Sequence, residues 1–171
     1  GKKNLKGTIP VYGAKNSVLP TMAASLLIHG ETVLENVPGI ADVRVMSTLL
    51  EKLGAFVAVT GTTVTVNARD VTGSVFDMAS AKSLRASVLL IGSVLARMGS
   101  VTFPHPGGDL IGERPIDLFI AGFKTLGATL TEAGDTYTLT APNGLTGGDF
   151  FFSTVSVTAT EALMMAAPRA K

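Results

Sequence analysis

The chain has 171 residues, of which 46% are hydrophobic and 16% are charged; its formal net charge is +1 and it contains no cysteine. So apolar a composition excludes a disordered chain. The small net charge argues against a nucleic-acid binder. The lack of cysteine excludes disulfides and thiolate metal sites. No apolar stretch approaches the roughly 20 residues of a membrane span, and none follows the basic residues 1–6 as in a secretory signal, so we expect a soluble, cytoplasmic protein with no membrane partner and no cofactor.

The first predicted elements are two helices and the strands that follow them. A helix rich in Ala, Leu and Met over residues 18–28 leads through Gly30 to a short strand at residues 32–34. A second helix over residues 43–53 precedes a strand of alternating Thr and Val at residues 63–66. Glycine commonly closes a helix in the left-handed conformation, and alternation with period two is typical of a half-buried strand.

The same series recurs further along the chain. Its predicted elements are helices over residues 84–98 and 115–126 and strands over residues 101–103 and 136–140. Gly99 again follows the first helix, and Pro115 takes the favoured first position of the second. The Leu-Gly-Ala sequence that starts at Leu53 recurs 73 residues later at Leu126. This internal repetition indicates a fold built from copies of one unit.

A third copy begins near residue 149, with a strand predicted at residues 151–153 and a helix over residues 157–167. We therefore predict a single α/β (α+β) domain of repeated βαβαββ units. The units span residues 5–75, residues 76–148 and, incompletely, residues 149–171. Because an incomplete unit cannot bury its helix alone, we expect either a fragment or a domain whose last unit is completed elsewhere.

Four polar clusters interrupt this apolar background, and each lies at the start of a predicted helix. Lys15 and Asn16 precede the first helix, where free N–H groups favour an anion or a sugar hydroxyl, although Asn16 or Ser17 could simply cap the helix. Lys82 and Arg85 lie three residues apart and so share a helix face, which could bind a ligand or merely face solvent. The two histidines lie far apart in the sequence, so no metal site is predicted.

The other two clusters precede the later helices. The loop at residues 104–117 carries glycines, acids and an arginine, as do the flexible charged loops that often close over active sites. Residues 155–161 combine Ser156 or Thr158 with Glu161, which matches a capping box and requires no functional role. Because matching ends of repeated units tend to face one surface, the four clusters together would suit a polyanion such as a nucleotide diphosphate.

At these clusters the sequence resembles the UDP-N-acetylglucosamine enolpyruvyl transferases, and the resemblance covers nearly the whole chain. It rests, in chain order, on residues 15–20 (KNSVLP), 84–87 (LRAS), 107–118 (GGDLIGERPIDL) and 156–161 (SVTATE). The third segment is the most specific, because the related shikimate-pathway enzyme shares the fold but not this loop. The resemblance implies the first of two similar domains, an inside-out α/β barrel with helices within and sheets outside. The active site would lie between this domain and a second one that is missing from the chain.

The resemblance also implies a role for each matching residue. Members of this family transfer the enolpyruvyl group of phosphoenolpyruvate to the 3-hydroxyl of UDP-N-acetylglucosamine in bacterial peptidoglycan synthesis. Lys15 and Arg114 would hold phosphoenolpyruvate. Asn16 would contact the sugar, and Arg85 would help to hold UDP-N-acetylglucosamine. The residues implied at the uridine end are Pro115, Asp117, Ser156 and Val157.

Asp109 stands at a loop position that is cysteine in most members of the family and aspartate in some. The resemblance makes it the catalytic residue that protonates the methylene carbon or assists product release. A thiol with a pKa of about 8.5 is protonated at neutral pH, whereas a carboxyl with a pKa of about 3.9 is not. The pKa of Asp109 must therefore rise by about 3, at a cost of roughly 4 kcal/mol, and we expect this rise only when the loop closes into a dry cleft.

The sequence departs from the family pattern near the nucleotide. Phe119 stands where a His is usual, Thr158 replaces a Gly, and Thr154 occupies a position that is often basic. Two functions therefore stay open. The first is the first domain of an enolpyruvyl transferase, inactive without its second domain. The second is a non-catalytic module that binds a UDP-sugar or pairs with another chain.

Overall fold

The computed structural model describes residues 3–105 and 116–171. The α-helices of this part are α1 (Lys15–Ala24), α2 (Ala41–Lys52), α3 (Met78–Ser83), α4 (Leu89–Met98), α5 (Asp117–Thr125) and α6 (Val157–Ala166). The strands are β1 (Glu31–Leu34), β2 (Phe56–Thr60), β3 (Thr63–Asn67), β4 (Ser100–Pro104), β5 (Thr129–Ala133) and β6 (Thr136–Thr140). Short 3₁₀ turns are η1 (Ser25–Leu27), η2 (Arg85–Val88) and η3 (Ala167–Arg169). Within the described ranges, no helix is long and apolar enough to span a membrane.

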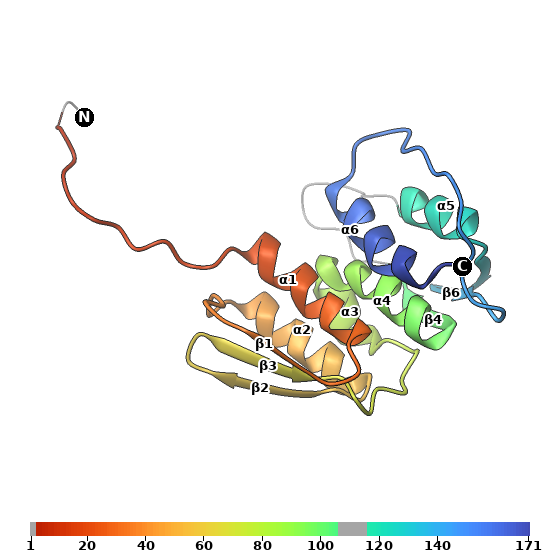
Figure 1. The fold of residues 1–171 in the computed structure, drawn as a ribbon, viewed down its shortest axis with the longest axis horizontal. Helices are drawn as coiled ribbons and strands as arrows, with labels where there is room; N and C mark the ends of the chain where they lie inside the picture. The colour runs from red at the N-terminus through yellow and green to blue at the C-terminus, as the bar shows by residue number, and fades with distance from the viewer. Residues whose placement is uncertain (1–2, 106–115) are drawn as a thin grey trace.

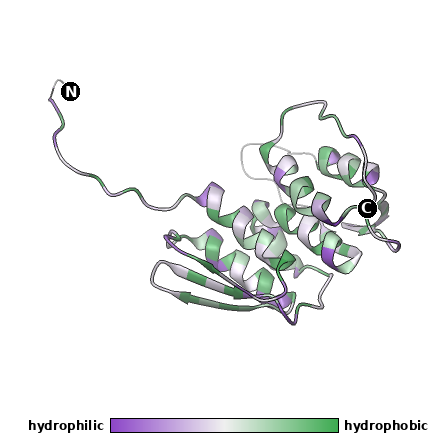
Figure 2. Cartoon of the chain, viewed as in Figure 1, coloured by the Kyte–Doolittle hydropathy of each residue, from purple (hydrophilic) through white to green (hydrophobic). Residues whose placement is uncertain are grey.

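Two antiparallel sheets of three strands repeat one arrangement. Their orders are β1-β3-β2 and β4-β6-β5, so in each sheet the last strand in sequence lies in the middle. The hairpins β2–β3 and β5–β6 turn at Gly61 and Gly134, whose φ angles of 60° and 59° are accessible to glycine without strain. Alternation along β3 directs Val64 and Val66 into the core, and Figure 2 shows the alternating residues along β2 and β3. The strands predicted at residues 63–66 and 136–140 are therefore confirmed.

The helices lie between the sheets, and α4 lies at their centre. Every residue of α4 from Leu89 to Leu95 is buried, and the helix packs against both α1 and α6 (Figure 1). Gly92 allows α4 and α6 to approach closely, because a Cβ at this position would lie 2.0 Å from the carbonyl oxygen of Ala162. The predicted arrangement, with helices inside and sheets outside, is confirmed.

The first helix of each predicted unit differs from its predicted bounds. Helix α1 begins at Lys15 instead of residue 18, so Lys15 belongs to its first turn. The helix predicted at residues 84–98 is wrong in its first part, because Leu84 adopts an extended backbone with φ −126° and ψ 108°. This residue separates α3 from η2 and buries its own side chain in the core. Gly99 closes α4 with a φ of 73°, as predicted, whereas Gly30 has no positive φ.

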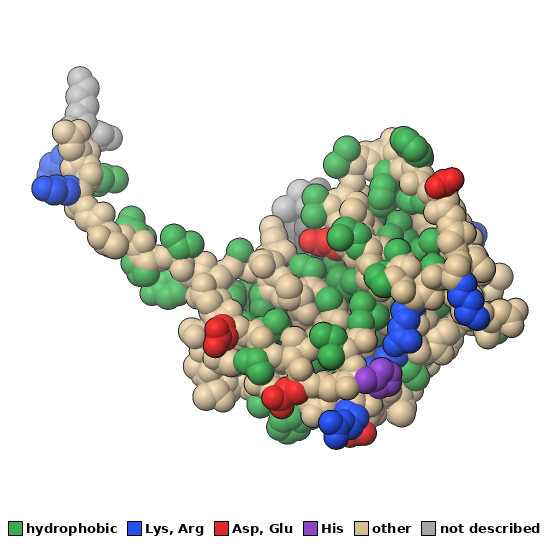
Figure 3. Space-filling view, in the orientation of Figure 1, with side chains coloured by type: hydrophobic (Ala, Val, Ile, Leu, Met, Phe, Trp, Pro, Cys, Tyr) green, Lys and Arg blue, Asp and Glu red, His purple; other side chains and the backbone are tan. Residues whose placement is uncertain are grey.

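The main error of the prediction is the first strand of each unit, which does not form. Residues 3–14 and residues 151–153 form no strand, and around Val75 there is only an isolated parallel bridge to Thr102. A strand forms where a neighbour accepts its backbone hydrogen bonds, and neither of the first two segments pairs with a strand among the described residues. Residues 3–12 extend away from the body with exposed hydrophobic side chains (Figure 3).

Candidate functional site

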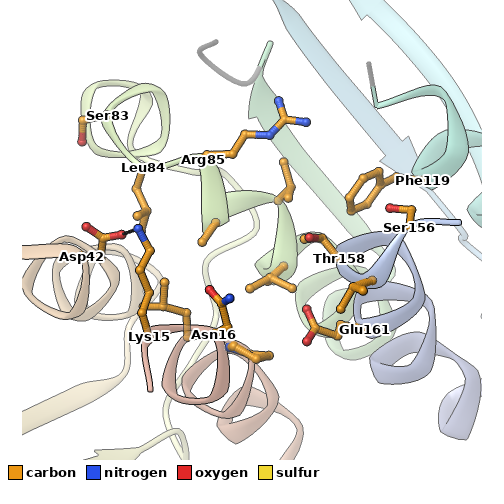
Figure 4. A pocket seen from close by; sticks show the side chains of 16 residues that line it. Lys15, Asn16, Asp42, Ser83, Leu84, Arg85, Phe119, Ser156, Thr158 and Glu161 are labelled. Atoms are coloured by element: carbon orange, nitrogen blue, oxygen red, sulfur yellow. Dashed lines mark ion pairs between the residues drawn. The ribbon is translucent and has the colours of Figure 1, made fainter. Parts of the chain in front are cut away.

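A cavity of about 790 Å³ opens where α1, η2 and α6 begin. This volume lies within the range of small-molecule sites. Its polar lining comes from segments far apart in the sequence (Figure 4). The polar and charged residues around it are Lys15, Asn16, Asp42, Ser83, Arg85, Ser156, Thr158 and Glu161. Apolar side chains such as Leu19, Leu84, Leu89 and Phe119 complete the wall.

The structure brings together five of the residues predicted to bind substrate. They are Lys15, Asn16, Arg85, Ser156 and Val157. Asp117 does not line the cavity; it is the exposed first residue of α5, and the buried Phe119 of the same helix contributes to the wall instead. Asp109, Arg114 and Pro115 lie outside the described residues, so the predicted catalytic residue and lid loop stay predictions.

Lys15 forms an ion pair with Asp42, which lies in the first turn of α2. The Lys15 side chain is 56% exposed and the Asp42 side chain 27% exposed. Ion pairs this accessible contribute at most about 1 kcal/mol. An anionic ligand could therefore take the ammonium group of Lys15 from Asp42 at little cost.

Arg85 reaches the cavity because the helical backbone is interrupted just before it. The extended Leu84 ends α3, and Arg85 then starts η2 with its side chain half-buried in the cavity wall. Lys82, still on α3, instead forms an ion pair with Asp135 in the β5–β6 turn. The prediction that Lys82 and Arg85 share a helix face is therefore wrong, and only Arg85 lines the cavity.

Ser156 caps α6, since its side-chain oxygen accepts a hydrogen bond of 3.2 Å from the Ala159 N–H. The predicted capping box is wrong, because Ala159 occupies the position at which the box requires Glu or Gln. The side chain of Glu161, one turn into the helix, lines the cavity instead. The polar residues at this helix start therefore divide between a cap and a cavity wall.

All of residues 1–171 match the family model described as EPSP synthase (3-phosphoshikimate 1-carboxyvinyltransferase). The chain belongs to the EPSP synthase family.

Within this family, its curated relatives carry another specific name. The UDP-N-acetylglucosamine 1-carboxyvinyltransferase 1 of Symbiobacterium thermophilum is 41% identical over 98% of the chain and 39% of that protein. The UDP-N-acetylglucosamine 1-carboxyvinyltransferase of Solibacter usitatus is 42% identical over 98% of the chain and 40% of that protein. The resemblance described from the sequence is thus confirmed. The chain spans about 40% of the length of these relatives.

Solved structures of the family share the fold. An EPSP synthase from Acinetobacter baumannii superposes with a TM-score of 0.77 at 18% identity, covering 100% of the chain and 40% of that protein. The enolpyruvyl transferase NikO from Streptomyces tendae gives a TM-score of 0.69 at 22% identity, covering 83% of the chain and 31% of that protein. The predicted enolpyruvyl transferase fold is therefore confirmed.

Sequence reasoning missed two acidic residues in the cavity of this enolpyruvyl transferase domain. Asp42 received no role, and Glu161 was interpreted only as part of a cap. Asp42 starts α2 just as the predicted clusters start other helices, so the same reasoning applied to every helix start would have included it. The predicted start of this helix at residue 157 is correct, but the sequence alone does not show which face of α6 borders the cavity, so Glu161 could not be placed.

Burial raises the pKa of the Glu161 carboxyl above its usual value of 4.5. The folded chain therefore resists ionisation of this group more than the unfolded chain does. Protonated Glu161 contributes its full stability at pH values below the pKa that it has in the unfolded chain. This stability is lost as the pH rises through the pKa of Glu161 in the folded chain.

In the Glu161→Gln variant, the glutamine side chain carries no charge at any pH. We expect this variant to match the unmodified chain in stability at about pH 4 and to exceed it at about pH 7.5. Urea unfolding at the two pH values measures the difference, with Glu51→Gln at an exposed position of α2 as the control. A stability difference that does not change with pH would contradict this expectation.

Proposed function

We propose that this chain is the substrate-holding domain of a UDP-N-acetylglucosamine 1-carboxyvinyltransferase, acting in the bacterial cytoplasm in peptidoglycan synthesis. The observation that carries the proposal is that Lys15, Asn16, Arg85 and Ser156, from three separate helix starts, line one cavity. Relatives that are 36–42% identical bear the name of this activity. The cavity combines cations, which suit phosphate and carboxylate groups, with an amide and hydroxyls, which suit a sugar.

The proposed roles follow the chemistry of each side chain. Lys15 and Arg114 hold the phosphate and carboxylate of phosphoenolpyruvate, and Arg85 holds the diphosphate of the nucleotide sugar. Asn16 forms hydrogen bonds to the sugar. The uridine end is formed by Pro115, Asp117, Ser156 and Val157.

In the proposed reaction, the sugar 3-hydroxyl loses its proton to a base of the second domain and its oxygen bonds to the central carbon of phosphoenolpyruvate, while the methylene carbon gains a proton from Asp109. The resulting methyl group then returns a proton to the Asp109 carboxylate as the bond between the central carbon and the phosphate oxygen breaks, which restores the double bond and releases phosphate. Lys15 and Arg114 would stabilise the negative charge of the departing phosphate. A protonated Asp109 needs surroundings that disfavour its charge, which closure against a second domain would supply.

Calorimetric titration with UDP-N-acetylglucosamine tests the binding role. We expect this chain to bind UDP-N-acetylglucosamine, and we expect no binding of shikimate 3-phosphate, which lacks a nucleotide for the Ser156 end of the cavity. Binding of shikimate 3-phosphate alone would contradict the assignment of the substrate.

Turnover is expected to require the second domain. With phosphoenolpyruvate and UDP-N-acetylglucosamine present together, the 171-residue chain should release no phosphate above the background without protein. A colorimetric phosphate assay measures this. Release above background would show that the residues of this domain suffice for the reaction.

A further inference from the structure

The charges around the cavity are unevenly distributed. Arg85 extends from η2 on one side, whereas Glu161 and Asn16 lie at the other side, on α6 and α1 (Figure 4). A carboxylate repels phosphate, so an anionic part of a ligand is favoured towards Arg85 and disfavoured beside Glu161. The end of the cavity formed by Asn16 and Glu161 is therefore suited to a neutral part of the ligand.

Glu161 has no partner of its own in the described part of the chain. The ion pairs found there join Lys15 to Asp42 and Lys82 to Asp135, and no described residue gives Glu161 a hydrogen bond. Its side chain is nevertheless half-buried in the cavity wall, where burial disfavours its charge. A partly buried carboxylate that no described residue pairs with is available to accept a hydrogen bond from a ligand, which would replace water around it.

A second polar group lies at the same end of the cavity. The side-chain amide of Asn16 supplies a carbonyl oxygen that accepts hydrogen bonds and an NH₂ group that donates them. Asn16 lines the cavity together with Glu161. This end therefore offers oxygen acceptors and calls for a ligand group rich in neutral donors. Sugar hydroxyls and an amide N–H have this chemistry.

We propose that Glu161 recognises the sugar, by accepting a hydrogen bond from a hydroxyl or the N-acetyl N–H of the sugar ring in a bound UDP-sugar. The inference rests on the proposed function, because it presumes that the cavity holds a UDP-sugar with its diphosphate towards Arg85. It adds a residue that contacts the sugar part of the ligand and not the UDP part.

The test compares two ligands that differ only beyond the diphosphate. UDP-N-acetylglucosamine and UDP are titrated separately by calorimetry into the unmodified chain, Glu161→Gln and the control Glu51→Gln. Gln preserves the shape of the side chain and removes its charge. Hydrogen bonds to charged groups contribute enough that Glu161→Gln should weaken UDP-N-acetylglucosamine binding about tenfold.

The same variant should bind UDP with unchanged affinity, and Glu51→Gln should bind both ligands like the unmodified chain. A purely structural role of Glu161 would change the binding of both ligands together. Equal effects on the two ligands, or no effect on either, would overturn the assignment of Glu161 while leaving the proposed function intact. If the unmodified chain bound neither ligand, the proposed function would fail, and the inference with it.

Discussion

Gly92→Ala is expected to destabilise the chain by about 3 kcal/mol, although alanine is the better helix former. The added Cβ would lie 2.0 Å from the Ala162 carbonyl oxygen and 2.9 Å from its carbonyl carbon, both of them backbone atoms. These atoms cannot rotate away, so α4 and α6 must separate and lose contacts along their shared buried face. Urea unfolding followed by circular dichroism measures the loss.

Gly122→Ala is the matched control, since Gly122 also lies within a helix. Its added Cβ would meet the terminal carbons of the Leu163 side chain, the nearest at 2.4 Å. A leucine side chain can change rotamer, and the gain in helix propensity of about 1 kcal/mol offsets part of the strain. We expect a loss well below that of Gly92→Ala. Equal losses in the two variants would show that the close approach of α4 and α6 is not what stabilises the bundle.

Arg85→Met is expected to weaken UDP-N-acetylglucosamine binding by about 10- to 100-fold, with little effect on thermal stability. Methionine retains most of the apolar stem that packs in the cavity wall and removes the guanidinium group. Loss of charge-assisted hydrogen bonds to a diphosphate is expected to cost about 1.5–3 kcal/mol, and each 1.4 kcal/mol corresponds to about tenfold in affinity. Calorimetric titration measures the change, and the dependence of affinity on salt should become weaker in the variant.

Lys82→Met is the control for this prediction. Lys82 lies three residues before Arg85 and carries the same charge, but it pairs with Asp135 away from the cavity. Its replacement should leave the affinity for UDP-N-acetylglucosamine nearly unchanged. If both variants lost affinity equally, a general positive field, and not the position of Arg85, would account for binding.

Local patterns predicted the repeated parts of the fold well. The Leu-Gly-Ala sequences at Leu53 and Leu126, the hairpin glycines and Gly99 each determine a backbone conformation through their own chemistry. The strands predicted at residues 63–66 and 136–140 are found at Thr63–Asn67 and Thr136–Thr140. These features depend on residues close in sequence, so a single sequence is enough to find them.

The errors arose where distant contacts decide the structure. The strand predicted at residues 151–153 has the right residue types, but a strand needs a partner that no local pattern supplies. The extended Leu84 buries its side chain in the core but interrupts the helix. Lys82, before this interruption, pairs with Asp135 and does not line the cavity. The predicted role of Asp117 depended on the family pattern, and the cavity wall contains Phe119 of the same helix instead.

No single segment of the chain forms the cavity, because its wall comes mainly from α1, from η2 with α4, and from α6, with Asp42 of α2 and Phe119 of α5. A ligand held there would connect stretches that lie far apart in the sequence, so it would favour their unfolding in one transition. At a ligand concentration of about 100 times the dissociation constant, this linkage adds roughly 2.7 kcal/mol to the free energy of unfolding.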